Sequence, residues 1–306
     1  MSYSALQKTL AQEVHFEGIG VHHGKSTQCT VTPNNEDSGI VFKRADLRNN
    51  SNSVPAHYTN VSSTSLCTTI AASTGGTSSI STIEHMMFAL WACEIDNAII
   101  TIDGDEVPIL DGSAQTFINA FRSAGSTTLK KKRQYLKVNK KIEVRNKDQH
   151  IILSPSNHFS VDYTIDYDHP AIRKQRYYFV KEHLETYDSE SRETQHLVNQ
   201  ININSICNAR TFGFINDVEQ LKKQGLALGA SQDNSVGLTK DGIMDNTQLR
   251  YNNEFVRHKV LDCIGDLYLA SMPMLCNVQA VKSGHSMNHK VLCELFNDPS
   301  AYSITK

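Results

Sequence analysis

Three titratable residues stand at helical spacing within one apolar segment. Residues 254–270 read EFVRHKVLDCIGDLYLA, and His258, Asp262 and Asp266 follow one another at intervals of four. Residues four apart are neighbours on a helix surface, so an imidazole nitrogen and a carboxylate oxygen could bind one metal ion there. An isolated pair of this kind is more often a surface ion pair. Beside an apolar stripe, however, such groups are costly unless they are paired or bind a metal.

A second group of candidate residues lies in STIEHMMFAL, residues 81–90. Ser81 and Glu84 match the S-x-x-E capping box, so Glu84 could simply close the start of a helix. His85 could be an ordinary core histidine. If His85 binds a metal instead, the adjacent Glu84 lies beside the ion, where a general base for an attacking water is needed.

Two further motifs carry reactive side chains but are weak in isolation. His285 follows Gly284 in AVKSGHSMNHK, and the chain holds 13 histidines. NARTFGF places the Thr211 hydroxyl before Phe212 and Phe214, whose ordinary role is core packing. The sequence contains no G-x-S-x-G, Walker A or G-x-G-x-x-G motif, and GIGVHHG at residues 18–24 precedes no helix pattern.

Composition excludes several classes of partner. The chain has 306 residues, with 30 Lys and Arg against 32 Asp and Glu. This near-balance of charges gives no global reason to expect a nucleic acid or an anionic membrane as partner. Seven cysteines without a C-x-x-C pair indicate reduced thiols. No secretory signal is apparent, and no apolar run approaches the ~18 residues that span a bilayer. We therefore expect a cytoplasmic protein without nucleic-acid partners or stable membrane insertion.

The pattern of elements predicts an α+β fold. Strand patterns occur at 65–82 (two strands around Gly75 and Gly76), 97–102, 135–144, 150–155 and 159–167, and the second-half strands alternate like antiparallel ones. Helix patterns occur at 81–94, 113–125, 215–225 and 257–270. Hairpin-connected strands favour α+β over doubly wound α/β. The small, then basic run at 123–133 predicts a solvated linker between two domains, and the polar stretch 180–200 predicts a surface excursion.

Six motifs, taken together, resemble the UDP-3-O-acyl-N-acetylglucosamine deacetylases, the zinc amidases of bacterial lipid A synthesis. In chain order they are STIEHMMFAL, DEVPILDGSA, ARTFGF, GLALGASQDNSVGL, EFVRHKVLDCIGDLYL and VKSGHSMNHK, and GIGVHHGK and TSLCTT are also similar. The resemblance spans about residues 7–295. It implies two similar two-layer domains, each a sheet packed on helices with a small insert bordering the site. We expect the first domain to span residues 1–127, with a β insert near 61–80. The second domain is expected to span residues 128–306, with an insert near 213–243.

The resemblance also implies roles for individual residues. The implied zinc ligands are His85, His258 and Asp262. The implied catalytic groups are Glu84 as general base, His285 as general acid, Asp266 as the carboxylate partner of His285, Thr211 as support for the oxyanion and Lys259 as a substrate-positioning residue. Ferrous iron would also suit two histidines and one carboxylate.

Substrate contacts follow in the same way. The resemblance implies Lys282 and Tyr167 as contacts to UDP, and a hydrophobic passage for the acyl chain along the second insert. The passage residues are Phe212, Ile215, Val218 and Ala227. Ile215, Val218 and Leu221 form a stripe that could equally pack on the core, with Glu219, Lys222 and Lys223 facing elsewhere, and residues 226–228 predict a short strand. A sugar-contacting lysine of some relatives aligns near Gln149, with Lys147 close by.

The activity that the resemblance implies is hydrolysis of the N-acetyl group of UDP-3-O-acyl-N-acetylglucosamine. This committed step of lipid A biosynthesis gives acetate and UDP-3-O-acyl-glucosamine, and we expect a monomer. Two alternatives stay open at this point: a non-catalytic nucleotide-sugar or acyl-ligand binding protein on the same scaffold, and an amidohydrolase for another acylated nucleotide sugar.

Overall fold

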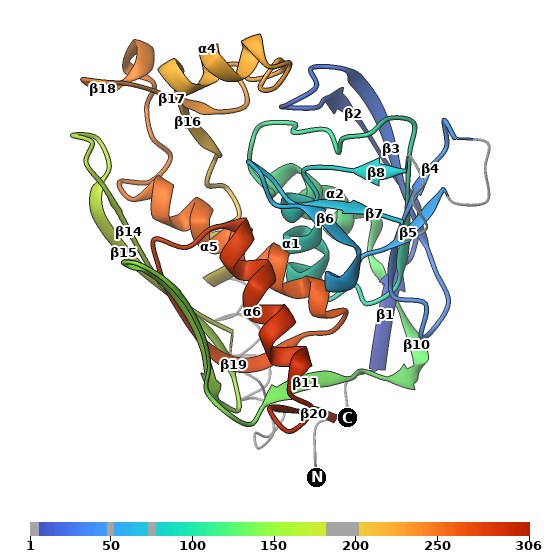
Figure 1. The fold of residues 1–306 in the computed structure, drawn as a ribbon. Helices are drawn as coiled ribbons and strands as arrows, with labels where there is room; N and C mark the ends of the chain where they lie inside the picture. The colour runs from blue at the N-terminus through green and yellow to red at the C-terminus, as the bar shows by residue number, and fades with distance from the viewer. Residues whose placement is uncertain (1–5, 48–51, 73–77, 182–201) are drawn as a thin grey trace.

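The computed structural model describes residues 6–47, 52–72, 78–181 and 202–306, which form two larger sheets with helices between them (Figure 1). The first sheet has five strands, in the spatial order β2 (Val14–Ile19), β3 (Ser26–Pro33), β9 (Ala98–Ile102), β4 (Ile40–Arg44) and β5 (Ser53–Pro55). Helix α2 (Gln115–Ala124) packs on it, with Phe117 and Phe121 edge-on to Phe16 at 4.8 and 5.9 Å between ring centroids.

The second sheet has seven strands. Five follow one another as β12 (Ile142–Asn146), β13 (Gln149–Pro155), β19 (Met274–Val281), β11 (Tyr135–Val138) and β20 (Tyr302–Thr305). β14 (Phe159–Tyr167) also pairs with β19, and β15 (Arg173–Lys181) lies outside β14. The strands expected at 150–155 and 159–167 are confirmed, but the run expected at 135–144 is divided into β11 and β12, which are not neighbours in the sheet. The antiparallel arrangement is also wrong in part. β19 enters the sheet late in the chain and runs parallel to both β11 and β14.

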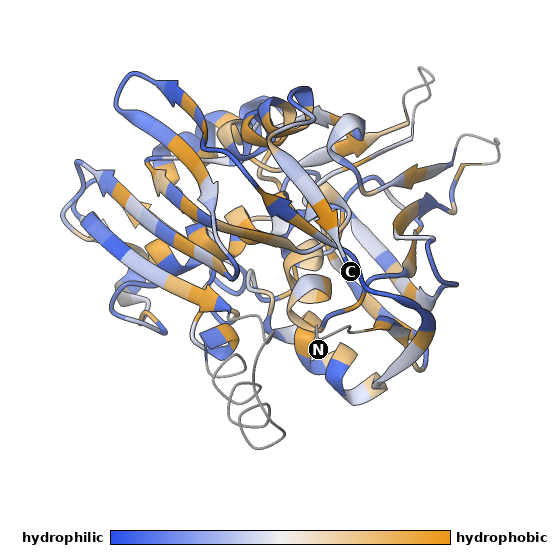
Figure 2. Cartoon of the chain, turned by 90° about the horizontal axis from the view of Figure 1, so that it is seen from below, coloured by the Kyte–Doolittle hydropathy of each residue, from blue (hydrophilic) through white to orange (hydrophobic). Residues whose placement is uncertain are grey.

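Strand sequences explain which sheet face is buried. In β14 the residues alternate, for example buried Tyr163 and Ile165 against partly or fully exposed Thr164 and Asp166. Figure 2 shows strands that alternate between hydrophilic and hydrophobic residues in this way. Such alternation is typical of a sheet with one solvated face. The mixed α+β fold predicted from the sequence is confirmed.

Three helices lie between the two larger sheets: α1 (Glu84–Ala92), α5 (Glu254–Leu267) and α6 (His285–Asn297) (Figure 1). The 3₁₀ turn η3 (Tyr268–Ala270) continues α5. Every residue of α1 is buried. A Cβ atom built on Gly265 of α5 would lie 2.1 Å from the carbonyl oxygen of Glu84 on α1. The two helix backbones therefore meet at a point where only glycine fits.

Two small sheets border these helices. One contains β6 (Val61–Ser63), β7 (Thr69–Ala71) and β8 (Ser79–Ile80), and follows η1 (Tyr58–Asn60). It confirms the two Ser/Thr-rich strands, while their Gly75–Gly76 turn lies outside the described residues. The other contains β16 (Phe212–Phe214), β17 (Val236–Thr239) and β18 (Gly242–Ile243), with α4 (Ile215–Lys223) and η2 (Met244–Asn246).

The strand predicted at residues 226–228 is wrong, because this stretch is a turn. Ala227 has a positive φ of 53°, which no regular strand contains. The backbone N–H groups of Leu228 and Gly229 donate to the carbonyl oxygens of His22 and Val21, at 2.9 and 3.1 Å. The turn is thus held by the loop that contains Val21 and His22 rather than by a neighbouring strand.

The predicted linker is a strand. β10 (Ser126–Lys132) pairs with β1 (Leu6–Leu10) and exposes most of its residues, as expected of a solvated segment. Arg133, which follows it, is buried and pairs with Asp96 at 2.7 Å. The domain boundary near residue 127 stays a prediction. The polar stretch 180–200 starts at the end of β15 and otherwise lies outside the described residues. Among the described residues, no helix is both long and apolar enough to cross a bilayer.

The contact at Gly265 gives a stability prediction. Replacing Gly265 by Ala gains about 1 kcal/mol of helix propensity, but overpacking typically costs about 1–3 kcal/mol, and here the methyl group meets backbone. We expect Gly265→Ala to lower the free energy of unfolding in chemical denaturation. The matched control is Gly242→Ala, whose Cβ has no atom within 4 Å. Equal stability of the two variants would contradict the close helix contact.

Candidate metal centre and active site

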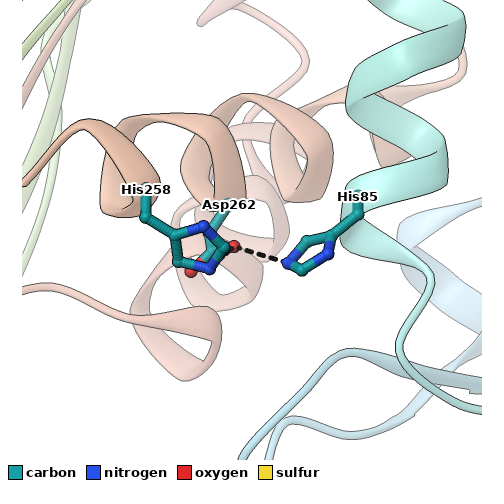
Figure 3. Close-up of side chains that lie close together, drawn as sticks. All are labelled: His85, His258 and Asp262. Carbon is teal, nitrogen blue, oxygen red and sulfur yellow. Dashed lines mark ion pairs between the residues drawn. The ribbon is translucent and has the colours of Figure 1, made fainter. Parts of the chain in front are cut away.

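Two histidines and one aspartate form a buried cluster where α1 faces α5 (Figure 3). His85 is the second residue of α1, and His258 and Asp262 lie one turn apart on α5. Asp262 Oδ1 lies 3.5 Å from His85 Nε2 and 3.3 Å from His258 Nε2. One ligand atom from each residue lies within 4.8 Å of the others. The three predicted metal ligands are therefore brought together from distant parts of the chain.

The polar atoms of this cluster suit a cation. His258 Nδ1 donates to the carbonyl oxygen of Ala209 at 3.0 Å, which turns the Nε2 lone pair toward the cluster. Asp262 Oδ2 accepts from Lys259 Nζ at 2.9 Å. Asp262 Oδ1 is buried and has no hydrogen-bond partner among the described residues. A buried carboxylate oxygen that faces two imidazole nitrogens is costly unless a positive charge lies between them.

The protonation states also fit metal binding. Burial lowers the pKa of His258 to about 4, so its imidazole is neutral at pH 7. Burial acts to raise the pKa of Asp262, but His258 and Lys259 outweigh it and hold that pKa well below its usual value. Metal ligands must be deprotonated, and both residues are. Three protein ligands leave a coordination position open, which is typical of catalytic rather than structural sites.

Glu84 does not cap its helix, so that alternative is wrong. The N-cap of α1 is Ile83, without a side-chain cap bond, and Ser81 Oγ donates to the carbonyl oxygen of Asp105 instead. Glu84 Oε2 accepts from the backbone N–H of Thr68 at 3.1 Å. Burial raises the pKa of Glu84, although His285 and His85 oppose this shift. A carboxyl group with a raised pKa beside the metal cluster suits a general base.

His285 starts α6 and is held by a carboxylate. Its Nδ1 lies 2.8 Å from Asp266 Oδ2, and its Nε2 lies 3.8 Å from Glu84 Oε1. Burial acts to lower the pKa of His285, but Asp266 and Glu84 outweigh it and raise this pKa to about 9. The predicted pairing of His285 with Asp266 is therefore present, and it leaves a charged imidazolium whose Nε2–H faces Glu84.

Thr211 is positioned by its backbone. Its N–H donates to the carbonyl oxygen of Gly112 at 2.8 Å, and its own carbonyl oxygen accepts from Val236 N–H at 2.9 Å. The preceding residue, Arg210, forms a buried ion pair with Glu254 at the start of α5, at 2.9 Å. These contacts tie the ARTFGF segment to α5, the helix that carries His258 and Asp262. Thr211 also lines a cavity beside the metal cluster.

This cavity of about 520 Å³ collects most of the predicted site residues. Its lining includes the predicted metal ligands and catalytic groups Glu84, His85, Thr211, His258, Lys259, Asp262 and His285. It also includes the predicted substrate residues Tyr167, Phe212, Ile215, Val218 and Ala227. Asp266 lies behind His285 and does not line it.

The apolar stripe of α4 faces the cavity rather than a core. No residue of α4 is buried, yet Ile215, Val218 and Leu221 all line the cavity. The alternative that this stripe packs on the domain core is therefore wrong. Glu219 and Lys222, which were expected to face elsewhere, also reach the lining. Lys223 does not, as predicted.

Phe212 has two environments. Its ring packs edge-on against Phe255, with centroids 4.9 Å apart, and lies 6.1 Å from Tyr167. It is only partly buried, because another part of it lines the cavity. Core packing and a place in the site are thus combined in one residue.

Lys282 lies outside the main cavity. It pairs with Asp148 at 2.8 Å and with Asp166 at 3.3 Å, and it lines an adjoining depression that shares Tyr167 with the main cavity. Lys147 and Gln149 flank Asp148 in the sequence, and Asp148 is the ion-pair partner of Lys282. Which of them contacts a sugar stays open.

Four residues that support the site were not predicted. Thr68 Oγ1 donates to Asp266 Oδ1 at 2.6 Å, and Asn288 Nδ2 donates to Asp266 Oδ2 at 2.9 Å. The carbonyl oxygen of Ala209 accepts from His258 and orients its ring. Gly265 lacks a side chain, which allows α1 to pack closely against α5. Thr68 lies in the TSLCTT motif, but nothing in its spacing signals a contact with residues 198 positions away.

Comparison with known proteins adds an independent finding. Residues 7–297 match the family model described as UDP-3-O-acyl N-acetylglycosamine deacetylase. A protein of Geobacter sp. (strain M21) named UDP-3-O-acyl-N-acetylglucosamine deacetylase is 42% identical over 298 residues, covering 97% of this chain and 91% of that protein. Proteins of the same name from Geotalea uraniireducens (strain Rf4) and Teredinibacter turnerae (strain ATCC 39867 / T7901) are 42% and 38% identical over 300 and 299 residues. They cover 98% and 97% of this chain, and 91% and 92% of their own lengths.

The cluster gives a metal-binding prediction. We expect one divalent ion per chain by elemental analysis, and a lower Tm after chelation that added Zn²⁺ restores, because a ligand bound only to the folded state stabilises it. Loss of a residue that only orients a metal ligand typically weakens metal binding by about 10–100-fold. Because His258 is itself a proposed ligand, we expect His258→Ala to weaken Zn²⁺ binding by more than this. His15→Ala, at a side chain that is 67% exposed, is the control. Undiminished Zn²⁺ affinity in His258→Ala would rule out this cluster.

Proposed function

Because the chain belongs to the UDP-3-O-acyl N-acetylglycosamine deacetylase family, we propose that one Zn²⁺ and the pair Glu84 and His285 carry its chemistry. The chain is a deacetylase of lipid A biosynthesis. Its substrate is UDP-3-O-acyl-N-acetylglucosamine, from which it releases acetate and leaves a free amine on the sugar. One observation carries the proposal: a base and an acid lie 3.8 Å apart beside a buried cluster of His85, His258 and Asp262.

Zinc is the proposed ion. When bound by His85, His258 and Asp262, it would polarise the amide carbonyl and lower the pKa of a water molecule. Ferrous iron fits the same ligands, and the choice between the two rests on metal analysis of protein from its native cell. The proton transfers and substrate positioning are assigned to side chains of the protein.

Glu84 starts the reaction as general base. Its carboxylate takes a proton from the water that attacks the acetyl carbonyl. The backbone N–H of Thr68 donates to Oε2 of Glu84. The other oxygen, Oε1, faces His285 and is free to accept the proton from water. A pKa raised by burial makes this carboxylate a stronger base than a solvated one.

His285 completes the reaction as general acid. Collapse of the tetrahedral intermediate would expel an amide anion unless the nitrogen receives a proton. Asp266 holds Nδ1, so the proton on Nε2 is the one delivered to the leaving nitrogen. Asp266 and Glu84 outweigh burial and raise the pKa of His285 to about 9, which favours the protonated imidazole at pH 7.

Thr211 and Lys259 act on the reacting group from the cavity wall. The Thr211 hydroxyl donates to the developing oxyanion, and a donor fixed in advance is worth more there than in water. Lys259 is held by Asp262 at 2.9 Å and lines the cavity, so its positive charge is available to position the substrate. We assign UDP to the depression of Tyr167 and Lys282, and the acyl chain to the α4 side of the cavity.

The direct test is acetate release from UDP-3-O-acyl-N-acetylglucosamine, followed by mass spectrometry. We expect Glu84→Gln to lower kcat by roughly 10²–10⁴, the usual worth of a general base, and to keep its Zn²⁺. Glu13→Gln, at a side chain that is 60% exposed, is the control. Substrate binding without acetate release by the wild type would favour a binding protein instead. Faster release from another acylated nucleotide sugar would favour the wider amidohydrolase alternative.

The paired histidine gives a pH prediction. His285 must keep its proton, so kcat/KM falls as pH rises through its pKa, which gives the alkaline limb of a bell-shaped profile. Asp266 raises this pKa, and an uncharged amide does not, so Asp266→Asn should move the alkaline limb to lower pH. The measurement is kcat/KM against pH for both proteins at full Zn²⁺ loading. An alkaline limb that stays in place would mean that another group supplies the proton.

The stripe on α4 gives a specificity prediction. Each buried methylene contributes about 0.8 kcal/mol, so substrates with long 3-O-acyl chains should have higher kcat/KM than short-chain ones. Val218→Trp should fill the cavity and reduce kcat/KM for long chains much more than for short ones. Ala227 is a poor site for this probe, because it is 4% exposed in the turn bonded to Val21 and His22, and a larger side chain would displace that turn.

Gln220→Trp is the matched control for Val218→Trp, because Gln220 is exposed on the same helix and lies outside the cavity lining. Parallel plots of kcat/KM against chain length for wild type and Val218→Trp would remove α4 from the acyl site.

A further inference from the structure

Thr82 has an unfavourable backbone conformation two residues before Glu84. Its φ is +57°, a region that β-branched residues rarely adopt. The chain then passes through Ile83, the N-cap of α1, and reaches Glu84 as the first residue of the helix. The direction in which Glu84 enters the cavity is therefore set at Thr82. Such strain persists only where surrounding contacts impose it.

A buried carboxylate bonds to the side chain of this residue. Glu106 is 1% exposed, and its Oε1 accepts from Thr82 Oγ1 at 2.8 Å. The residue before Thr82 is fixed to the same segment by its backbone. Ser81 N–H donates to the carbonyl oxygen of Asp105 at 3.0 Å, and Val107 N–H donates to that of Ser81 at 3.1 Å.

The same carboxylate holds a second segment, the loop at residues 20–24. Glu106 accepts from the backbone N–H of His22 at 2.9 Å and from that of His23 at 2.8 Å. A Cβ built on Gly20 would lie 2.2 Å from Glu106 Oε2, so the loop closes tightly around the carboxylate. Val21 and His22 of this loop line the cavity.

The loop also fixes part of the cavity wall on the acyl side. The carbonyl oxygens of Val21 and His22 accept from Gly229 and Leu228, in the turn that contains Ala227. Glu106 neither lines the cavity nor belongs to the metal cluster, yet its bonds join the segment before Glu84 to the wall on the α4 side.

We propose that Glu106 is a positioning residue with two effects, an inference that rests on the proposed role of Glu84 as base. Through Thr82 it sets the orientation of Glu84, and through the loop at 20–24 it sets the cavity wall that receives the acyl chain. A carboxylate suits this role because it only accepts hydrogen bonds, and the three groups around it are all donors. A glutamine would place an N–H group against at least one of them.

Thr82, which also lines the cavity, is the position that tests the effect on the base. Thr82→Val keeps the shape but loses the hydroxyl, and Thr82→Ser keeps the hydroxyl. We expect Thr82→Val to lower kcat by about 10–100-fold, because small displacements of a reacting group cost up to about that factor. Its KM and bound Zn²⁺ should stay close to wild type, and Thr82→Ser should restore most of the lost kcat.

A further variant covers failure to fold. If Thr82→Val gives no soluble protein, Thr82→Gly serves instead, since glycine adopts positive φ without strain and also lacks the hydroxyl. Wild-type kcat in a folded Thr82→Val or Thr82→Gly protein would overturn the inference.

Glu106→Gln tests both effects together, with Asp105→Asn as the matched control. Asp105 is the neighbouring carboxylate, bonds to His23 Nδ1 at 3.0 Å and is one-third exposed. We expect Glu106→Gln to lower kcat and also to weaken the dependence of kcat/KM on acyl-chain length, whereas Asp105→Asn changes neither. A fall in Tm with unchanged kcat and unchanged chain-length dependence would reduce Glu106 to a purely structural role.

The outcome separates this inference from the proposed function. If Glu84→Gln keeps full kcat, the base assignment fails and the role of Glu106 in orienting it fails with it. If Glu84→Gln is inactive while the Thr82 and Glu106 variants keep wild-type kcat and chain-length dependence, only the positioning inference fails.

Discussion

The site depends on the contact between two helix backbones. α1 and α5 approach so closely that the Glu84 carbonyl oxygen occupies the space where a side chain on residue 265 would begin. This contact brings His85 within 3.5 Å of Asp262, although the two residues are 177 positions apart in the sequence (262 − 85). It also fixes Glu84, because the first residue of α1 is the one in contact. The candidate metal ligands and the proposed base are thus positioned by one packing interaction inside a core rather than by loops.

Charge balance explains how so many ionisable groups stay buried at this contact. Asp262 faces His85, His258 and Lys259, while Asp266 faces His285, Thr68 and Asn288. The two histidines nearest these acids have opposite shifts. Burial lowers the pKa of His258 to about 4, whereas Asp266 and Glu84 overcome burial and raise the pKa of His285 to about 9. This separation of pKa values supports the roles proposed above, His258 as a metal ligand and His285 as the general acid.

The sequence predicted local features of this arrangement better than distant ones. The spacing of His258 and Asp262 indicates a shared helix face, and local periodicity located β9, β13, β14 and four helices, whereas no pattern predicted β1–β5, β19 or α6. The partnership of these residues with His85 and His285 has no local signal, and it came only from the resemblance to a family. Thr68 and Gly265 were missed for the same reason, since their importance lies in contacts made after folding. The capping box at Ser81 failed because Glu84 is turned toward the cluster, and the strand at 226–228 failed because a neighbouring loop holds that turn.

The central claim is that two adjacent carboxylates of α5 have different duties, with Asp262 binding the ion and Asp266 holding a protonated histidine. Anomalous diffraction at the zinc edge from crystals of the Zn²⁺-loaded protein tests it directly. The account predicts one anomalous peak about 2.0–2.2 Å from His85 Nε2, His258 Nε2 and an oxygen of Asp262, with the Asp266–His285 hydrogen bond intact. A peak bound by His285 or Asp266, or one displaced from His85, would contradict it.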